Sequence, residues 1–142
     1  MKILKSLFFL SIVGLSSCYR ISHEAYGTMY FSVSDIEKAE LISALDSFAK
    51  DNSMVKIQEG GERMLPEKMK VLVHAIYENS QDYQLAVQNF LNVYCYSAST
   101  YDFGNKDYKV AENLSKKLKN RFQSVFNGRL TFYKDQYCEQ AI

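Results

Sequence analysis

Residues 84–96 read QLAVQNFLNVYCY, and the prediction of the fold begins from their pattern. Apolar side chains occupy odd-numbered positions: Leu85, Val87, Leu91, Val93 and Cys95. Polar and aromatic side chains occupy even-numbered positions: Gln84, Gln88, Asn92, Tyr94 and Tyr96. An alternation with period two is typical of a strand that buries one face, and a helix does not need it. The stretch therefore predicts one arm of a long antiparallel hairpin.

The segment before this stretch, residues 69–77, fits two structures. Met69, Leu72, Val73, Ile76 and Tyr77 would share a helix face, whereas Met69, Val71, Val73, Ala75 and Tyr77 would share a strand face. The abundance of Val, Ile and Tyr favours a strand, and residues 78–82 are typical of a hairpin loop. We interpret residues 69–77 as the other arm of the hairpin, with a helix as the alternative.

The sequence pattern of the N-terminal part of the domain predicts a strand, a helix and a second strand. Apolar Met29, Phe31 and Val33 alternate with polar neighbours. Ser34 and Glu37 then form a capping box at a helix start, and the helix ends at Asn52-Ser53. Residues 55–58 alternate again. Two strands joined through a helix are expected to run parallel in one sheet.

The C-terminal part predicts a loop, a helix and a last strand. Residues 97–106 contain Ser, Thr, Gly and Asn and are expected to form the loop. The helix follows, with apolar side chains every three or four residues at Tyr108, Ala111, Leu114, Leu118, Phe122 and Val125. Asn127-Gly128 supplies the left-handed stop that such a helix prefers. A strand from Leu130 then carries the chain to Cys138.

These elements predict one α+β domain over residues 28–142. The simplest arrangement is a two-layer sandwich with two amphipathic helices on one face of a mostly antiparallel sheet of four or five strands. It resembles a ferredoxin-like fold with an extra strand. That resemblance concerns the fold and implies no activity.

The N-terminus carries an export signal. Lys2 and Lys5 precede an apolar run over residues 7–13, which is too short to span a bilayer. The sequence Leu15-Ser16-Ser17-Cys18 then resembles the lipobox of bacterial lipoproteins. The resemblance implies that residues 1–17 are removed, that Cys18 carries the lipid, and that residues 18–27 are a tether. An ordinary signal peptide is the alternative.

The lipoprotein resemblance also implies a location. An acidic residue after the lipidated Cys often retains such proteins in the inner membrane, and Tyr19 stands there in this chain. The resemblance therefore favours the outer membrane, on its periplasmic face, over the inner membrane or the cell surface.

Cys95 and Cys138 are the remaining thiols in an oxidising compartment, so we expect them to form a disulfide. A redox or metal-binding pair is the alternative.

The sequence contains no pattern that specifies catalysis, a metal or a cofactor. The histidines are His23 and His74, and neither has a partner pattern around it. Zinc-protease, nucleophile-elbow and phosphate-loop motifs are absent. Glu37 and Glu40 beside Lys38 are typical of a solvated helix face. We therefore expect a protein that is not an enzyme and that binds no cofactor.

Charge and aromatic residues suggest two binding surfaces. The formal net charge is +1, which does not indicate a nucleic-acid binder. Within residues 106–129, however, Lys109, Lys116 and Lys119 predict a basic helix face that could contact lipid phosphates or an acidic partner. Tyr94 and Tyr96 predict a partner surface on the sheet. The alternatives are an ordinary solvated face and aromatic cover over the sheet.

Together these features predict a lipid-anchored accessory protein that binds another envelope component without catalysing a reaction. Two alternatives stay open. The chain could be an exclusion or immunity lipoprotein that masks a surface receptor. It could also be a hydrolase of envelope polymers, which would require a convergent acid and base pair.

Overall fold

A computed structural model of the chain describes residues 25–33, 36–64, 70–90, 95–104, 107–135, 137–139 and 141–142. In chain order the elements are β1 (Ala25–Val33), α1 (Lys38–Asp51), β2 (Val55–Glu59), β3 (Glu62–Met64), β4 (Lys70–Glu78), β5 (Tyr83–Phe90), β6 (Tyr96–Asp102), α2 (Tyr108–Phe126) and β7 (Leu130–Tyr133). Cys18, the predicted lipidation site, and Ser34 lie outside the described residues. The predicted Ser34–Glu37 capping box is wrong, because Glu37 is itself the N-cap of α1 and makes no side-chain capping bond.

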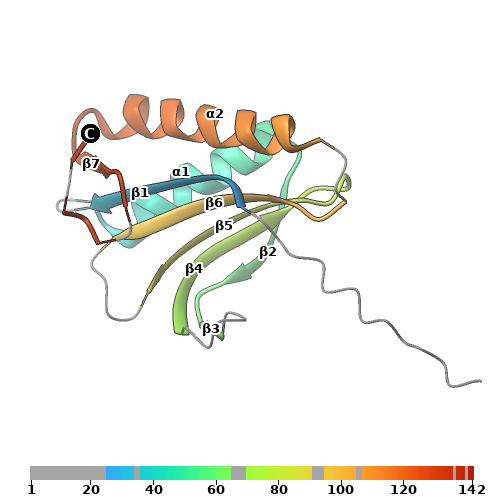
Figure 1. The fold of residues 1–142 in the computed structure, drawn as a ribbon, viewed down its shortest axis with the longest axis horizontal. Helices are drawn as coiled ribbons and strands as arrows, with labels where there is room; N and C mark the ends of the chain where they lie inside the picture. Colours follow the sequence, from blue (N-terminus) through green and yellow to red (C-terminus); the bar gives the residue numbers. More distant parts are fainter. Residues whose placement is uncertain are drawn as a thin grey trace, which may run out of the picture.

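The strands form one sheet of seven (Figure 1). Six follow the order β2-β4-β5-β6-β1-β7, and β3 pairs with β4. Every pairing is antiparallel. The predicted ferredoxin-like sandwich with four or five strands is therefore wrong. The strands on either side of the first helix, β1 and β2, run parallel in one sheet as expected, although β4, β5 and β6 lie between them.

The hairpin in the middle of the chain has the predicted connection, but the prediction that residues 84–96 form one arm is wrong, because β5 ends at Phe90 and Tyr96 begins β6. β4 and β5 pair from Val71 opposite Phe90 to Glu78 opposite Gln84. Asn79 closes the turn, because its side-chain oxygen accepts hydrogen bonds from the backbone N–H groups of Gln81 at 3.0 Å and Tyr83 at 3.1 Å. Asp82 takes the left-handed conformation there, with φ of 65°. Residues 70–78 are thus a strand and not a helix.

The strand β6 covers residues 97–102 of the loop expected at residues 97–106, which accounts for part of the error in strand number. Its small polar side chains are buried, and each has a hydrogen-bond partner that keeps it in the sheet. Ser97 Oγ donates to the carbonyl of Gln88 at 3.2 Å, and Ser99 Oγ lies 3.0 Å from Thr28 Oγ1. Tertiary contacts therefore outweigh the loop-forming tendency of Ser and Thr.

Both helices end as the sequence suggests. α1 ends at Asn52, which donates from its side chain to the carbonyl of Phe48 at 2.8 Å. α2 ends at Asn127, which has φ of 42°, followed by Gly128 with φ of 83°. Side chains of the two helices and of the sheet form one core cluster. Its fully buried members include Phe31, Leu45, Leu85, Leu118 and Phe122.

A second, smaller cluster lies on the opposite face of the sheet. Ala86 stands between Leu85 and Val87 in β5 and therefore points away from the main core. It is buried together with Val73 and Ile76, and Tyr101 packs against them. The described helices include none that is long and apolar enough to cross a membrane.

The cysteine pairing agrees with the prediction. Cys95 and Cys138 form a disulfide, with their Cα atoms 5.7 Å apart. The bond ties the segment after β7 to the start of β6. Two backbone contacts hold the end of the chain beside β7: Ala141 bridges to Tyr133, and Ile142 donates to the carbonyl of Phe132 at 2.9 Å.

Candidate functional site

The start of α2 is fixed by two aspartates. The carboxylate of Asp102, at the end of β6, accepts hydrogen bonds from the backbone N–H groups of Gly104 and Asp107, both at 2.9 Å. Asp107 is the N-cap, and its carboxylate accepts from the backbone N–H of Lys109 at 2.9 Å. These bonds satisfy amide groups that have no partner inside the helix. They set where α2 begins relative to the sheet.

α2 then packs unusually close to β6 and β1. Thr100 Oγ1 donates to the carbonyl of Ala111 at 2.8 Å. At Gly27 in β1, an added Cβ would stand 2.6 Å from Cβ of Ser115 and 2.9 Å from its Oγ. Only glycine leaves room for that approach. The side chains that follow Ser115 on α2 are therefore held beside β1.

β1 has a strand on only one side along its first half. β6 pairs with it from Ala25 to Phe31, whereas β7 pairs with it only from Tyr30 to Val33. After Tyr133 the chain bends at residues 134–135 instead of continuing along β1. Among the described residues, no strand lies beside the outer edge of Ala25–Met29.

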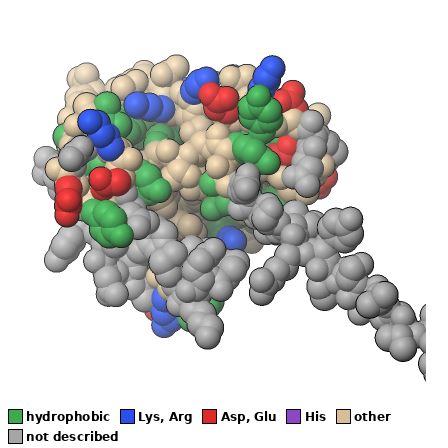
Figure 2. Space-filling view, in the orientation of Figure 1, with side chains coloured by type: hydrophobic (Ala, Val, Ile, Leu, Met, Phe, Trp, Pro, Cys, Tyr) green, Lys and Arg blue, Asp and Glu red, His purple; other side chains and the backbone are tan. Residues whose placement is uncertain are grey.

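A groove of about 220 Å³ opens at this edge, between β1, α2 and the end of β7. We call it the β1–α2 groove. Its lining combines three lysines, four hydroxyl side chains and three apolar side chains. These are Lys116, Lys119 and Lys134; Thr28, Tyr30, Ser115 and Tyr133; and Met29, Phe132 and Ile142. Figure 2 shows Lys and Arg side chains along the upper edge of the molecule, where α2 lies, with Asp and Glu side chains among them.

The three lysines come from two elements that are far apart in the sequence. Lys119 is half-buried, and its Nζ lies 5.1 Å from the centroid of the Phe132 ring, a cation–π contact that holds the side chain over the groove. Lys116 is exposed and forms an ion pair with Glu112 at 2.7 Å. Lys134 is exposed and stands just past the end of β7. Together they concentrate positive charge around the groove.

Three of the hydroxyl side chains, those of Thr28, Tyr30 and Tyr133, have the parity opposite to Met29 and Phe132 and therefore lie on the other face of the sheet from α2. Burial raises the pKa of the Tyr30 hydroxyl, and the nearby Tyr101 and Asp135 raise it further. Tyr30 therefore stays protonated at neutral pH and can donate a hydrogen bond. The Tyr133 hydroxyl lies 3.3 Å from Ser32 Oγ. A carboxylate or phosphate on the α2 side of the groove would meet the ammonium groups of the lysines, and Ser115 is the hydroxyl side chain on that side.

The structure brings together two of the three predicted basic residues and adds one that was missed. Lys116 and Lys119 both line the β1–α2 groove, whereas Lys109 is exposed near the start of α2 and does not line it. Lys134 was missed because it lies beyond the helix in the sequence. Its place directly after a strand was the only available signal.

The tyrosine surface predicted at Tyr94 and Tyr96 is not what the structure has at Tyr96. Tyr94 lies outside the described residues. Tyr96 is half-buried, and its ring stacks on Phe31 with centroids 5.6 Å apart and lies 4.6 Å from the ring of His74. Tyr96 thus packs against the main core rather than standing on the outward face of the sheet.

His74 is a buried side chain with a hydrogen-bond partner inside the protein. Its Nε2 lies 2.7 Å from the side-chain oxygen of Asn89. Burial lowers the pKa of His74, the hydrogen bond with Asn89 opposes that change, and the charge on Lys38 adds to it. The ring is therefore held neutral. In the part of the chain that the structure describes, no group of three or more His, Cys, Asp or Glu side chains could hold a metal ion.

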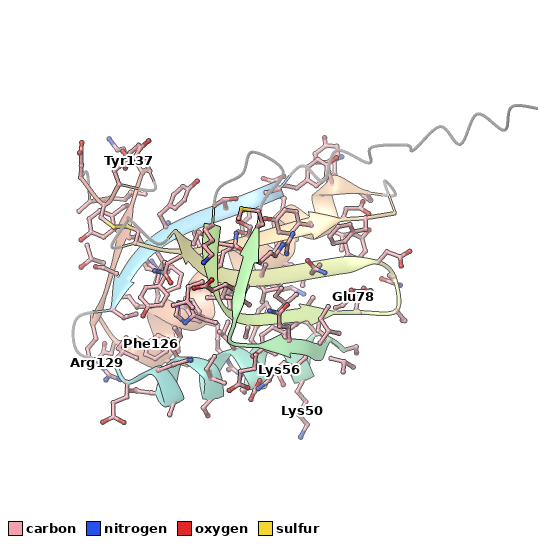
Figure 3. The ribbon with its side chains drawn as sticks, turned by 90° about the horizontal axis from the view of Figure 1, so that it is seen from below. Lys50, Lys56, Glu78, Phe126, Arg129 and Tyr137 are labelled. Atoms are coloured by element: carbon pink, nitrogen blue, oxygen red, sulfur yellow. A yellow bond between two sulfur atoms is a disulfide. The ribbon has the colours of Figure 1, made fainter. Side chains whose placement is uncertain are left out.

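A second groove lies between the two helices, but ion pairs occupy its polar groups. Arg121 donates to Ser47 Oγ and to a carboxylate oxygen of Asp51, both at 2.8 Å. Arg129 pairs with Glu40, and its guanidinium lies 5.8 Å from the Phe126 ring; Figure 3 labels both Arg129 and Phe126. These contacts join α1 to α2 and to the turn before β7, so this groove serves packing.

Comparison of the chain with protein-family models, curated proteins and solved structures found no match.

Proposed function

We propose that this chain is a lipid-anchored protein of the bacterial cell envelope, and that it binds an anionic envelope component through the β1–α2 groove without catalysing a reaction. The observation that carries the proposal is the convergence of Lys116, Lys119 and Lys134 on one groove. No carboxylate, imidazole or thiol side chain is among the described residues that line it. The lining thus suits binding better than acid–base chemistry.

The resemblance of Leu15–Cys18 to a lipobox supports the anchor and the location on the periplasmic face of the outer membrane. A lipid on Cys18 would also limit the distance between the groove and the membrane surface. Seven residue steps separate Cys18 from Ala25, where β1 begins, and they span at most about 25 Å. The groove lies along β1, so its ligand would be a component at or near the membrane surface.

Lys→Gln substitutions test the groove, because they remove positive charge and keep a polar side chain at each position. The full-length protein in mild detergent is titrated with poly-L-glutamate and, separately, with nanodiscs that contain phosphatidylglycerol. We expect K116Q/K119Q/K134Q to weaken binding to the preferred probe by about tenfold at low salt, because three cationic contacts are lost. The matched control is K50Q/K109Q/K117Q, which removes the same charge from exposed lysines outside the groove.

The control triple includes Lys50 on α1, which Figure 3 shows projecting away from the body of the protein. Equal weakening by the two triple variants would contradict the proposal, because it would make binding a property of total charge. The anchor is tested by mass spectrometry of the N-terminal peptide of the membrane-extracted protein. We expect a diacylated Cys18 at the N-terminus, and a chain that begins elsewhere would refute the anchor.

A further inference from the structure

We propose that the ligand of the β1–α2 groove is an acidic segment of another protein, which binds in extended conformation along the outer edge of Ala25–Met29 and adds a strand to the sheet. The proposal rests on the proposed function, because it names the class of component that the groove would bind. Three features of the described residues support it: a strand edge, the charge above that edge, and the length of the open part.

The first feature is the backbone of β1. On the inner side it pairs with β6, but on the outer side β7 stops opposite Tyr30, at the pair Tyr30–Tyr133. An edge without a neighbour presents backbone N–H and C=O groups to any extended chain that approaches. A bound strand would lie end to end with β7. It would begin where the chain bends away at Lys134–Asp135.

The second feature is the charge above the edge. In a strand, alternate side chains point to opposite faces of the sheet. Met29 and Gly27 face the core and α2, since Met29 belongs to the main core cluster and Gly27 meets Ser115. Side chains of an added strand on that same face would meet Lys116 and Lys119 of α2. The groove therefore selects acidic residues at every second position.

The other face of the added strand would meet different side chains. Thr28 and Tyr30 have the parity opposite to Met29, and both line the groove. Thr28 is exposed and bonded to Ser99, and Tyr30 has a protonated hydroxyl. Polar residues such as Thr or Ser suit this side. The recognised segment thus alternates acidic and small polar residues.

The third feature is length. The open edge holds five residues, Ala25 to Met29, which span roughly 17 Å in an extended strand. A bulge interrupts the β1–β6 register between Ala25 and Gly27, so regular geometry covers the part from Gly27 onward. The partner segment is therefore short, and the lysines must supply selectivity that a few backbone hydrogen bonds cannot.

Backbone pairing separates this proposal from a lipid or polysaccharide ligand. Anionic headgroups can satisfy the lysines but cannot pair with the edge of β1. The probe is a synthetic peptide of about eight residues that alternates Glu and Thr. The controls are the same peptide N-methylated at alternate residues, in both registers, which keeps the charge but blocks strand pairing, and a peptide with Lys in place of Glu.

Binding to the isotope-labelled full-length protein in detergent is followed by amide NMR and hydrogen exchange. We expect the acidic peptide to slow amide exchange within residues 25–29, and the N-methylated peptides to bind about tenfold more weakly. The Lys peptide is expected not to bind. K116Q/K119Q/K134Q should weaken the acidic peptide, and K50Q/K109Q/K117Q should not.

Two outcomes would overturn the strand proposal and leave the proposed function standing. In one, N-methylated and unmodified acidic peptides bind equally well. In the other, phosphatidylglycerol nanodiscs bind in a groove-dependent manner while the peptide does not. If neither probe responds to the groove variants, both the strand proposal and the proposed function fail.

Discussion

Gly27 of β1 lies directly against Ser115 of α2, so close that a Cβ at position 27 would stand 2.6 Å from the Cβ of Ser115. This contact sets the distance between helix and strand, and so the width of the β1–α2 groove. We expect Gly27→Ala to destabilise the protein by about 1–3 kcal/mol, the usual cost of overpacking. Denaturant unfolding of the purified protein measures the loss.

A second variant tests whether the cost arises from this one contact. Ser115→Gly removes the Cβ that the new methyl group would meet. The double variant is therefore expected to be more stable than the sum of the two single changes predicts. Strict additivity would show that Gly27 is required for a different reason.

Tyr77 and Asp46 form a hydrogen bond that should make stability depend on pH. The buried Tyr77 hydroxyl donates to Asp46 Oδ1 at 2.7 Å. Burial works to raise the pKa of Asp46, but the hydrogen bonds from Tyr77 and Lys56 outweigh it, and the pKa is lowered. The contribution of the carboxylate is thus complete above its unfolded pKa of about 3.9 and is lost as pH falls through the lower folded value.

Tyr77→Phe removes this hydrogen bond and little else. We expect a loss of about 1.5 kcal/mol at neutral pH, because the acceptor is charged. The loss should shrink when the pH is brought well below about 3, where the carboxylate is protonated. Urea unfolding at both pH values checks this, with Asp46→Asn as the control. A loss that is the same at both pH values would exclude the charge-assisted bond.

The disulfide should contribute much of the stability of the C-terminal region. Cys95 and Cys138 are 43 residues apart in the sequence. Closing a loop of that length stabilises the folded state by about 4 kcal/mol in the chain-entropy estimate. We expect Cys95→Ser with Cys138→Ser to lower the free energy of unfolding by about that amount. Unchanged stability under reducing conditions would contradict a structural role.

A substitution at Tyr96 tests whether its ring packs within the fold or forms part of a docking surface. Its ring lies on Phe31 and beside His74, so we expect Tyr96→Ser to destabilise the protein by about 2 kcal/mol or more, as other truncations of packed aromatic residues do. Tyr137, which is exposed, provides the control, and Tyr137→Ser should have little effect. If Tyr96→Ser leaves stability intact, the packing is not what the stacked rings indicate.

Local signals in the sequence were sufficient for several elements. The Asn127-Gly128 stop ends α2 because both residues take the left-handed conformation without great cost. The loop after Glu78 forms because Asn79 can bond the backbone of its own turn. The spacing of Leu114, Leu118 and Phe122 identified the buried face of α2. Each of these depends on neighbours within a few residues.

The errors have the opposite origin. β6 is a strand because Ser97 and Ser99 find partners in β5 and β1, more than eight residues away in the sequence. The three-residue β3 is too short to show a period. The groove itself needed Lys134 to stand beside Lys119, and only the pairing of β7 with β1 brings them together. Long-range pairings of this kind leave little trace in a single sequence.

The most direct test of the proposed function is partner capture with groove variants. The wild-type protein, K116Q/K119Q/K134Q and K50Q/K109Q/K117Q are produced at equal levels in the native membranes, crosslinked, and purified in mild detergent for mass spectrometry. We predict one envelope component that is recovered with the wild-type protein and with the control variant but is lost from the groove variant. Equal recovery with all three proteins would contradict binding through the β1–α2 groove.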